Sequence, residues 1–372
     1  MKFTISIGLL FLMLSVSASA ATIEVPATRP TVQAGIDAAA NGDTVLVAPG
    51  VYYENVCFRG KEIVLTSYFA LDHDPAFIET TILDGSQPAH PDTGSVVRIV
   101  DGEGPNTILQ GFTIRNGSGT IWTDEHDAGD FREGGAILCQ LSSPLIAHNH
   151  IIDNIVNDGT GVVSTGGGGI RTGDGAPRIV NNLFRGNYGA YGAAIVLNYC
   201  GEVLIRNNVI VFNENGGDYN GGALWAYSSS PAIVENCVIY GNLGVDGLVG
   251  GITARIRMRN SIVWSNTGVQ VRNASVVDLR YCDIMGGYDG TEIVDVDPLF
   301  GDTLDFYLAA NSPLIDVGDP SSYYDDVEDS TNPGLALFPA LGTVRNDMGA
   351  YGGHFRHNDF DGDGVVNSVD NC

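Results

Sequence analysis

The chain has 372 residues, and its 44 acidic residues outnumber its 18 lysines and arginines, which gives a net charge of −26 at pH 7. This charge argues against nucleic acid as a partner and against anionic membrane surfaces, because both would repel the protein. A hydrophobic share of 44% together with 49 glycines indicates a packed chain with many turns, not a disordered one.

Residues 1–20 predict a cleavable signal peptide. Lys2 precedes an apolar run from Ile5 to Leu14, and Ala18-Ser19-Ala20 has the small-residue pattern of a cleavage site. The apolar run is too short to span a membrane. We therefore expect a monomeric protein without a membrane span that is secreted or held at the cell surface.

Short β-rich runs begin near residue 45, and between residues 134 and 287 they form a repeat. Each unit holds three such runs separated by turn residues, and units recur at intervals of 21 to 38 residues. The repeats close on Asn154, Asn187, Asn213, Asn242 and Asn266, with Asn116 fitting before them and Gly287 after them. A unit of this kind cannot bury its own apolar face and must stack on its neighbours. The pattern predicts an all-β solenoid, a single-stranded parallel β-helix spanning residues 21–300.

The closing asparagines have a structural role in such a coil. Successive rungs lie about 4.8 Å apart, so identical amides can form a hydrogen-bonded ladder along the solenoid. Asparagine also tolerates the left-handed backbone of a tight corner. We interpret these residues as ladder and turn residues.

The opening segment TVQAGIDAAANGDTVLVAPGVYYENV (31–56), together with the repeat, resembles the right-handed parallel β-helix, or pectin-lyase-like, superfamily over nearly the whole mature chain. The resemblance implies a right-handed coil whose open end is capped by a short helix. Val32 and Ile36, four residues apart, would face the core. The superfamily includes lyases, hydrolases, epimerases and proteins without known chemistry, so the resemblance implies a fold and not an activity.

Six cysteines in an exported protein suggest disulfides, but their spacing does not. Cys237 and Cys282 occupy the same repeat position two rungs apart, roughly 9 to 10 Å, which exceeds the reach of a disulfide. We expect most of five cysteines to be unpaired, with Cys139 pointing into the core: Cys57, Cys139, Cys200, Cys237 and Cys282.

The longer repeats carry their extra residues at one corner. These insertions fall between a closing asparagine and the next Gly-Gly pair, at 117–133, 155–166, 214–220 and 243–249. They would form one wall beside the strand that follows. Loops on a rigid scaffold are where function concentrates.

Alternation along that strand separates an inward from an outward face. With Ile137, Ile170, Ile195, Leu224 and Ile252 placed inward, the outward face gathers aromatic, amide and guanidinium groups. Aromatic faces stack on pyranose rings, and guanidinium groups pair with uronate carboxylates. This face predicts a groove for an extended polysaccharide or a cell-surface glycan, formed by Arg171, Asn198, Trp225, Tyr227 and Arg255. If loops cover the face instead, the protein is a structural spacer or adhesion module.

A polysaccharide lyase or a glycoside hydrolase in the same groove is the catalytic alternative. Elimination on a polyuronate needs an arginine or lysine base, for which Arg171 and Arg255 are the candidates. The sequence has no aspartate cluster at fixed spacing beside them and no short signature of the pectate lyase or polygalacturonase families. Asp174 is the only carboxylate in that strand region, so a hydrolase with paired aspartates has little support. The acidic loop 123–130 could hold a cation or simply be a solvated charge run.

Residues 301–356 predict a closing segment. With the preceding 296–300 they resemble the last rung and irregular cap of many exported bacterial β-helix proteins, where a cap protects the exposed sheet edge. We interpret Asp316, Asp319 and Asp347 as turn residues.

Residues 357–372 contain the pattern of a calcium loop. Oxygen donors fall at positions 1, 3, 5, 9 and 12 of a twelve-residue loop, with glycine at position 6 and a backbone carbonyl at position 7. The loop resembles the start of a thrombospondin type 3 repeat, and a dockerin loop is similar. The resemblance implies a Ca²⁺-stiffened stalk or linker whose ligands are Asp359, Asp361, Asp363, Val365, Asn367 and Asp370.

Overall fold

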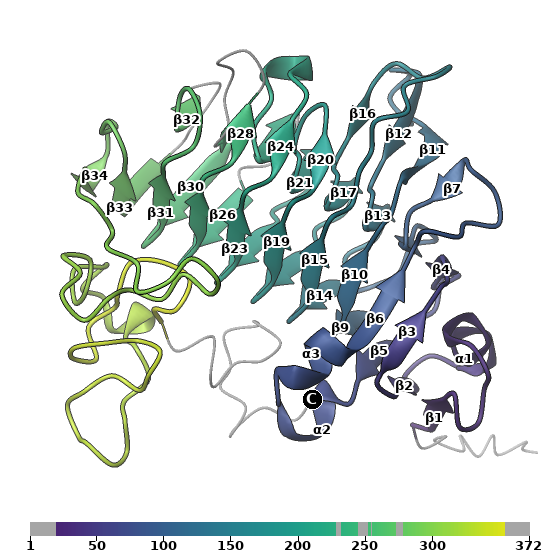
Figure 1. Ribbon diagram of the computed structural model, residues 1–372, viewed down its shortest axis with the longest axis horizontal. Coiled ribbons are helices and arrows are strands. Elements are labelled where there is room, and N and C mark those ends of the chain that lie inside the picture. Colours follow the sequence, from purple (N-terminus) through teal and green to yellow (C-terminus); the bar gives the residue numbers. More distant parts are fainter. Residues whose placement is uncertain (1–19, 228–231, 245–251, 254, 273–277, 354–372) are drawn as a thin grey trace, which may run out of the picture.

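The computed structural model describes residues 20–227, 232–244, 252–253, 255–272 and 278–353. The proposed signal peptide, apart from Ala20, and the proposed calcium loop lie outside these described residues. Within them the chain is a parallel β-helix whose rungs stack from the N-terminal to the C-terminal part of the chain (Figure 1).

The large sheet contains two parallel stacks of short strands. The first stack is β1 (Thr22–Val25), β2 (Thr44–Val47), β5 (Val64–Ser67), β9 (Ile108–Gln110), β14 (Leu145–Ala147), β18 (Arg178–Val180), β22 (Leu204–Arg206), β26 (Ala232–Glu235), β30 (Ile256–Arg259), β33 (Asp278–Ile284) and β34 (Thr291–Val294). The second stack is β3 (Gly50–Tyr52), β6 (Thr81–Asp84), β10 (Thr113–Arg115), β15 (His150–Ile152), β19 (Leu183–Arg185), β23 (Val209–Val211), β27 (Val238–Tyr240) and β31 (Ile262–Trp264), and β33 pairs with both stacks.

An eight-stranded parallel sheet, here called the site sheet, forms the third side of the coil. Its strands are β4 (Val56–Cys57), β8 (Val97–Ile99), β13 (Ile137–Gln140), β17 (Ile170–Gly173), β21 (Ile195–Asn198), β25 (Leu224–Tyr227), β29 (Ile252–Thr253) and β32 (Val271–Arg272). Its register places Ile137, Ile170, Ile195, Leu224 and Ile252 in one line, as the alternation predicts. The first four of these side chains are fully buried in the core that fills the coil.

The asparagine ladder is confirmed. Each asparagine donates from its backbone N–H and its side-chain amide to the side-chain oxygen of the asparagine one rung later. These bonds run from Asn154 as the first donor to Asn266 as the last acceptor. The ladder ends on Gln270, and at its other end the N–H of Gly117 donates to Asn154. The expected first member, Asn116, is therefore wrong by one residue. A second ladder joins Asn149, Asn182 and Asn208 at the neighbouring corner.

The N-terminal end carries the expected capping helix, α1 (Val32–Ala38). The Thr31 hydroxyl accepts from the N–H of Ala34, which caps the first turn, and Val32 and Ile36 are fully buried. Lys61 donates to the carbonyls of Ile36 and Asp37 in the last turn, both at 2.8 Å, so the only lysine after residue 2 is a structural group. Two further short helices, α2 (Phe69–Asp72) and α3 (Ala76–Thr80), follow β5.

The insertions form a second layer over the outward face of the site sheet. β11 (Gly119–Thr123) and β12 (Asp130–Glu133) pair antiparallel and are flanked by β7 (Thr93–Gly94) and β16 (Thr165–Gly166). Beside them β20 (Tyr188–Gly189), β24 (Glu214–Asn215) and β28 (Leu243–Gly244) form a three-stranded parallel sheet. The expected wall is therefore a second small sheet system and not a set of open loops.

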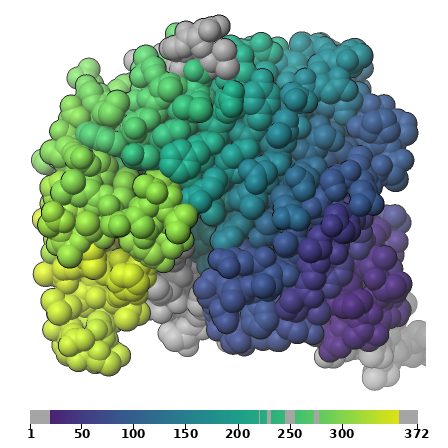
Figure 2. Space-filling view, in the orientation of Figure 1, coloured from purple at the N-terminus to yellow at the C-terminus, as the bar shows by residue number. Residues whose placement is uncertain are grey.

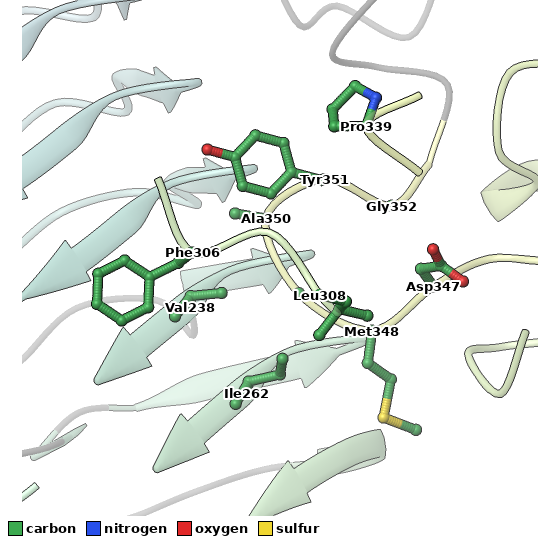
Figure 3. Close-up of a pocket in the computed structure, with 11 residues that line it drawn as sticks. Val238, Ile262, Phe306, Leu308, Pro339, Asp347, Met348, Ala350, Tyr351 and Gly352 are labelled. Carbon is green, nitrogen blue, oxygen red and sulfur yellow. The ribbon is translucent and has the colours of Figure 1, made fainter. Parts of the chain in front are cut away.

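The described part of the C-terminal segment, up to residue 353, packs along the side of the solenoid. Outward-facing Val238 and Ile262 contact Phe306, Met348 and other apolar side chains of residues 300–351 (Figure 3). In the space-filling view this yellow segment lies against the underside of the green rungs (Figure 2). The only regular element in it is the 3₁₀ turn η3 (Ser322–Tyr324) among the described residues. That this segment also caps the last rung stays a prediction, and the described contacts cover a side face.

Cys57, Cys139, Cys237 and Cys282 are free, in agreement with the expectation that most of the cysteines are unpaired. Cys139, Cys237 and Cys282 are fully buried in or beside the core, and burial raises the pKa of each thiol to about 12. They act as small apolar residues.

Candidate functional site

Arg171 does not line an open groove. Its side chain is only 1% exposed, because the β11–β12 hairpin folds over the middle of the site sheet. Its Nε lies 3.1 Å from Glu133 Oε2, and its guanidinium lies 3.7 Å from the ring centre of Trp122. The predicted exposure of Arg171 is therefore wrong: alternation identifies an outward side chain but not the layer that covers it.

Glu133 is the centre of a closed polar cluster. The Trp122 Nε1–H donates to it at 2.8 Å and the Tyr191 hydroxyl donates to its other oxygen. Burial and the neighbouring carboxylate raise the pKa of the Tyr191 hydroxyl, which therefore stays protonated. The charge of Arg171 is thus matched inside the protein by Glu133, and both groups are cut off from solvent.

Trp225 is also covered. Only 8% of its surface is exposed, and its ring packs edge-on against Tyr191 at 4.9 Å between centroids. Its Nε1–H donates to the carbonyl of Tyr219, in the 3₁₀ turn η1 (Asp218–Asn220). The predicted exposure of Trp225 is wrong for the same reason as that of Arg171, since the insertion before β25 folds back over the ring.

A second row of outward side chains lies two residues further along each strand than Arg171 and Trp225. It is exposed at its C-terminal end. Its members are aligned by the strand register in the order Gln140, Gly173, Asn198 and Tyr227. Gln140 is buried, Asn198 is half-buried and Tyr227 is 56% exposed. The predicted exposure of Tyr227 is confirmed, and Asn198 lies beside it one rung earlier.

Two residues outside the predicted groove, Tyr199 and His126, extend the exposed surface around Tyr227. Tyr199, at the corner after β21, approaches Tyr227 edge-on at 6.1 Å, and His126 from the β11–β12 loop stacks on Tyr199 at 3.5 Å. We call His126, Tyr199 and Tyr227 the aromatic strip. Trp225 lies beneath it, stacked on Tyr227 at 6.0 Å. The alternation pattern selects neither residue, because Tyr199 lies at the corner after β21 and His126 lies in the β11–β12 loop.

Carboxylates line the other side of the aromatic strip. The Nε2 of Gln140 donates to Glu125 Oε2 at 2.7 Å and to Asp174 Oδ2 at 2.8 Å. The other oxygen of Asp174 lies 2.9 Å from His126 Nε2. Two acidic side chains are therefore held at one amide nitrogen beside an exposed aromatic surface, and the buried Arg171 is already paired with Glu133.

Arg255 does not continue the outward row. β29 ends at Thr253, and the carbonyl of Arg255 accepts from the N–H of Ala232, which belongs to the first stack of the large sheet. Arg255 is exposed and directly precedes β30. In this rung the strand of the site sheet ends before Arg255, which the repeat alignment did not predict. Arg255 therefore adjoins the large sheet, whereas Arg171 lies in the site sheet.

No group of three histidine, cysteine or acidic side chains is arranged to hold a metal within the described part of the chain. Asp316, Asp319 and Asp347 accept hydrogen bonds from backbone N–H groups of the C-terminal segment, as expected of turn residues. Among the described residues no helix combines the length and the apolar character needed to cross a membrane.

No protein-family model matches the sequence, and no curated protein matches it. Among solved structures, the chain is similar to a crystal structure of pectate lyase Pel9A, with a TM-score of 0.37 and 14% sequence identity over 90% of this chain and 96% of that chain. A likeness this low carries no argument about activity. The rungs, ladders and register of the chain itself establish that it is an all-β parallel β-helix.

Proposed function

We propose that the protein is an exported glycan-binding β-helix that holds an extended, neutral polysaccharide across the aromatic strip. The observation that carries this proposal is the exposed ring of Tyr227, set beside Tyr199 and the half-buried amide of Asn198. Aromatic faces stack on the apolar faces of sugar rings, and amides and carboxylates bind their hydroxyl groups.

The charge around the strip favours neutral sugars over polyuronates. Glu125 and Asp174 place two carboxylates at its edge, and Arg171 is buried against Glu133. A uronate carboxylate would approach these like charges, and Arg171 is not available to pair with it. Arg171 therefore cannot form the guanidinium–uronate pair that was expected from the sequence.

The lyase alternative loses its best candidate base. A general base must come within about 3 Å of the proton that it removes. Arg171 is 1% exposed and paired, so a polymer on the surface cannot reach it. Arg255 remains exposed, and it directly precedes β30 of the large sheet.

A glycoside hydrolase is the second candidate, on one observation. Glu125 and Asp174 both bind the Nε2 of Gln140, which holds two carboxylates close together beside the aromatic strip. Two such groups, one protonated and one ionised, are what glycoside hydrolysis needs. The spacer alternative fits Arg171 and Trp225, which are covered, but not Tyr227, which is exposed.

The test is retention of the purified protein on immobilised neutral and acidic polysaccharides, with parallel detection of new reducing ends. Tyr227→Ala should weaken retention on a neutral polymer by about tenfold, the order expected for one lost stacking platform. Tyr53→Ala is the matched control, because Tyr53 is equally exposed at 53% but lies far from the strip. Retention on none of the polymers would refute binding. New reducing ends that disappear in Asp174→Asn would make the protein a hydrolase.

We also propose that residues 357–372 bind Ca²⁺ and stiffen a stalk or linker. The support is the spacing of Asp359, Asp361, Asp363, Asn367 and Asp370 in the sequence. Calorimetric titration of the full chain with CaCl₂ should give binding that Asp361→Ala removes, whereas Asp302→Ala, outside the loop, should leave it unchanged. Equal binding by both variants would place any calcium elsewhere.

A further inference from the structure

A groove of about 470 Å³ lies on the large sheet, apart from the aromatic strip. In Figure 1 the helices α2 and α3 and the yellow C-terminal segment stand on the same side of this sheet, with strands of the second stack between them. The groove is lined by residues from all three parts and shares none with the strip. We call it the lateral groove. Its volume is in the range typical of small-molecule sites.

The two walls of the lateral groove are mainly aromatic and apolar. Phe69 and Ile78 line it from α2 and α3. Tyr307 and Tyr351 line it from the C-terminal segment, where their rings lie 4.3 Å apart and the Tyr351 hydroxyl donates to the carbonyl of Asp305. Phe69, Ile78 and Tyr351 are largely buried, and the half-buried Tyr307 is the most open ring of these walls. An aromatic ring on an otherwise apolar wall suits a ligand with apolar faces, such as a pyranose ring.

The floor of the lateral groove carries polar side chains beside the apolar Leu183 and Val209. Asn181 and His148 lie there, with the Asn181 amide nitrogen 3.3 Å from His148 Nε2. Asn181 is 8% exposed, and no described atom donates a hydrogen bond to its Oδ1. A buried acceptor of this kind is stabilised when a donor, such as a ligand hydroxyl, reaches it.

The lining of the lateral groove is acidic. Glu79 and Asp305 contribute carboxyl groups, and the described lining residues include no lysine or arginine. Burial lowers the pKa of His73, which favours its neutral form at pH 7. The groove therefore disfavours anionic ligands such as uronates and nucleotides.

The floor also disfavours a peptide strand as the occupant. Strands β15, β19 and β23 already pair with one another, so their backbone groups are used within the ladder. A ligand must then be recognised by side chains. The polar and aromatic side chains that line the groove are aromatic rings, imidazoles, two amides and carboxyls.

We propose that the lateral groove is a second binding site, which takes a short neutral oligosaccharide of two or three sugars. Its rings lie between the walls, and a hydroxyl donates to Asn181 Oδ1. This site is independent of the aromatic strip, and its failure would leave the proposed function of the strip intact.

The experiment is calorimetric titration of the full chain with cellotriose, xylotriose, maltotriose and mannotriose, with trigalacturonate as the charged comparison. At least one neutral trisaccharide should bind the Tyr227→Ala variant as tightly as it binds the unchanged chain, which separates the groove from the strip. Leu183→Trp should abolish that binding, because Leu183 is half-buried in the floor and a larger ring would fill the groove. Trigalacturonate should bind at least about tenfold more weakly.

Asn181→Gly gives a second, milder variant. Asn181 has a left-handed backbone with φ 57°, which glycine adopts without strain, so this change removes the amide and keeps the corner. It should weaken binding about fivefold to tenfold. The matched controls are Leu335→Trp at an exposed site and Asn116→Gly at another left-handed corner, and both should bind normally. Absence of binding by all neutral trisaccharides, binding that survives Leu183→Trp, or tighter binding of trigalacturonate would each overturn the proposal.

Discussion

The Glu133–Arg171 pair shows why a polar residue on an outward strand position need not belong to a binding surface. Both side chains are at most 2% exposed, and each is the main partner of the other's charge. Replacing Glu133 by Ala would leave the guanidinium buried without its carboxylate. We expect the free energy of unfolding to fall by about 3 to 5 kcal/mol, measured by urea unfolding.

The exposed pair of Arg257 and Glu202 is the control for that prediction. Their side chains are 50% and 56% exposed, and their closest atoms are 3.3 Å apart. Glu202→Ala should change the free energy of unfolding by less than about 1 kcal/mol, because water screens an exposed pair. A similar loss in both variants would mean that the buried pair has no special role in stability.

The asparagine ladder predicts a second effect at the level of single residues. Asn213 accepts from the backbone N–H and the amide of Asn187 and donates to the carbonyls of Phe184 and Val211 and to Asn242. Asn213→Ala leaves several buried groups without partners, so we expect a loss of at least about 2 kcal/mol in urea unfolding. Asn332→Ala, at an exposed turn of the C-terminal segment, should have little effect. A ladder variant as stable as the unchanged chain would contradict this role.

At the scale of elements, period and register could be predicted from the sequence. The line Ile137, Ile170, Ile195 and Leu224 follows from alternation, because a strand of a solenoid has one face that must be buried. What covers the other face could not be predicted. The β11–β12 hairpin is an antiparallel pair inside an insertion, and it depends on contacts across rungs that no local pattern reports.

The covering of the large sheet had a signal in the sequence. In β23, β27 and β31 the outward positions are apolar, with Val209, Val238 and Ile262 among them, so these runs are apolar on both faces. In a parallel sheet such continuous apolar runs indicate burial on both sides. They predict a covering layer over these rungs, and the C-terminal segment is that layer.

The attachment of the C-terminal segment should depend on pH. Burial and the nearby Asp347 raise the pKa of Asp326 to about 8, and burial raises the pKa of Asp347 to about 7, although backbone N–H donors to both act in the opposite direction. Each folded-state pKa lies above the unfolded value near 4, so the folded form holds extra protons between the two values. The resulting stabilisation is present below about pH 4 and is lost as the pH rises through 7 to 8.

Hydrogen exchange of residues 300–353 measures this effect directly. We expect protection of the segment, corrected for the intrinsic rate, to fall between about pH 5 and pH 8 more than protection of the central rungs. Asp326→Asn removes one titrating group and should flatten the dependence. Asp283 in β33 is unchanged in this variant, and burial raises its pKa to about 7. The overall free energy of unfolding should therefore still decrease with rising pH. Equal pH dependence in both proteins would refute the role of Asp326.

At the scale of the whole molecule, the net charge of −26 should act with the carboxylates at the strip to select neutral glycans. The long-range field reaches about 30 Å at 0.01 M salt and about 8 Å at 0.15 M salt, whereas stacking on Tyr227 has little dependence on salt. Retention on a neutral polysaccharide should therefore be nearly constant between these salt concentrations. Retention on polygalacturonate should be absent at 0.01 M and should increase, if it occurs, only as salt is added.

The variant Glu125→Gln with Asp174→Asn separates the local charge from the global one. It removes both carboxylates at the aromatic strip and leaves most of the net charge in place. If local charge decides the selection, this variant should retain polygalacturonate at 0.15 M salt better than the unchanged chain, and retention should still fall at 0.01 M because the remaining charge repels the polymer. Tighter retention of polygalacturonate at low salt by the unchanged chain would mean that a cationic surface binds the glycan, and the aromatic strip would then not be its site.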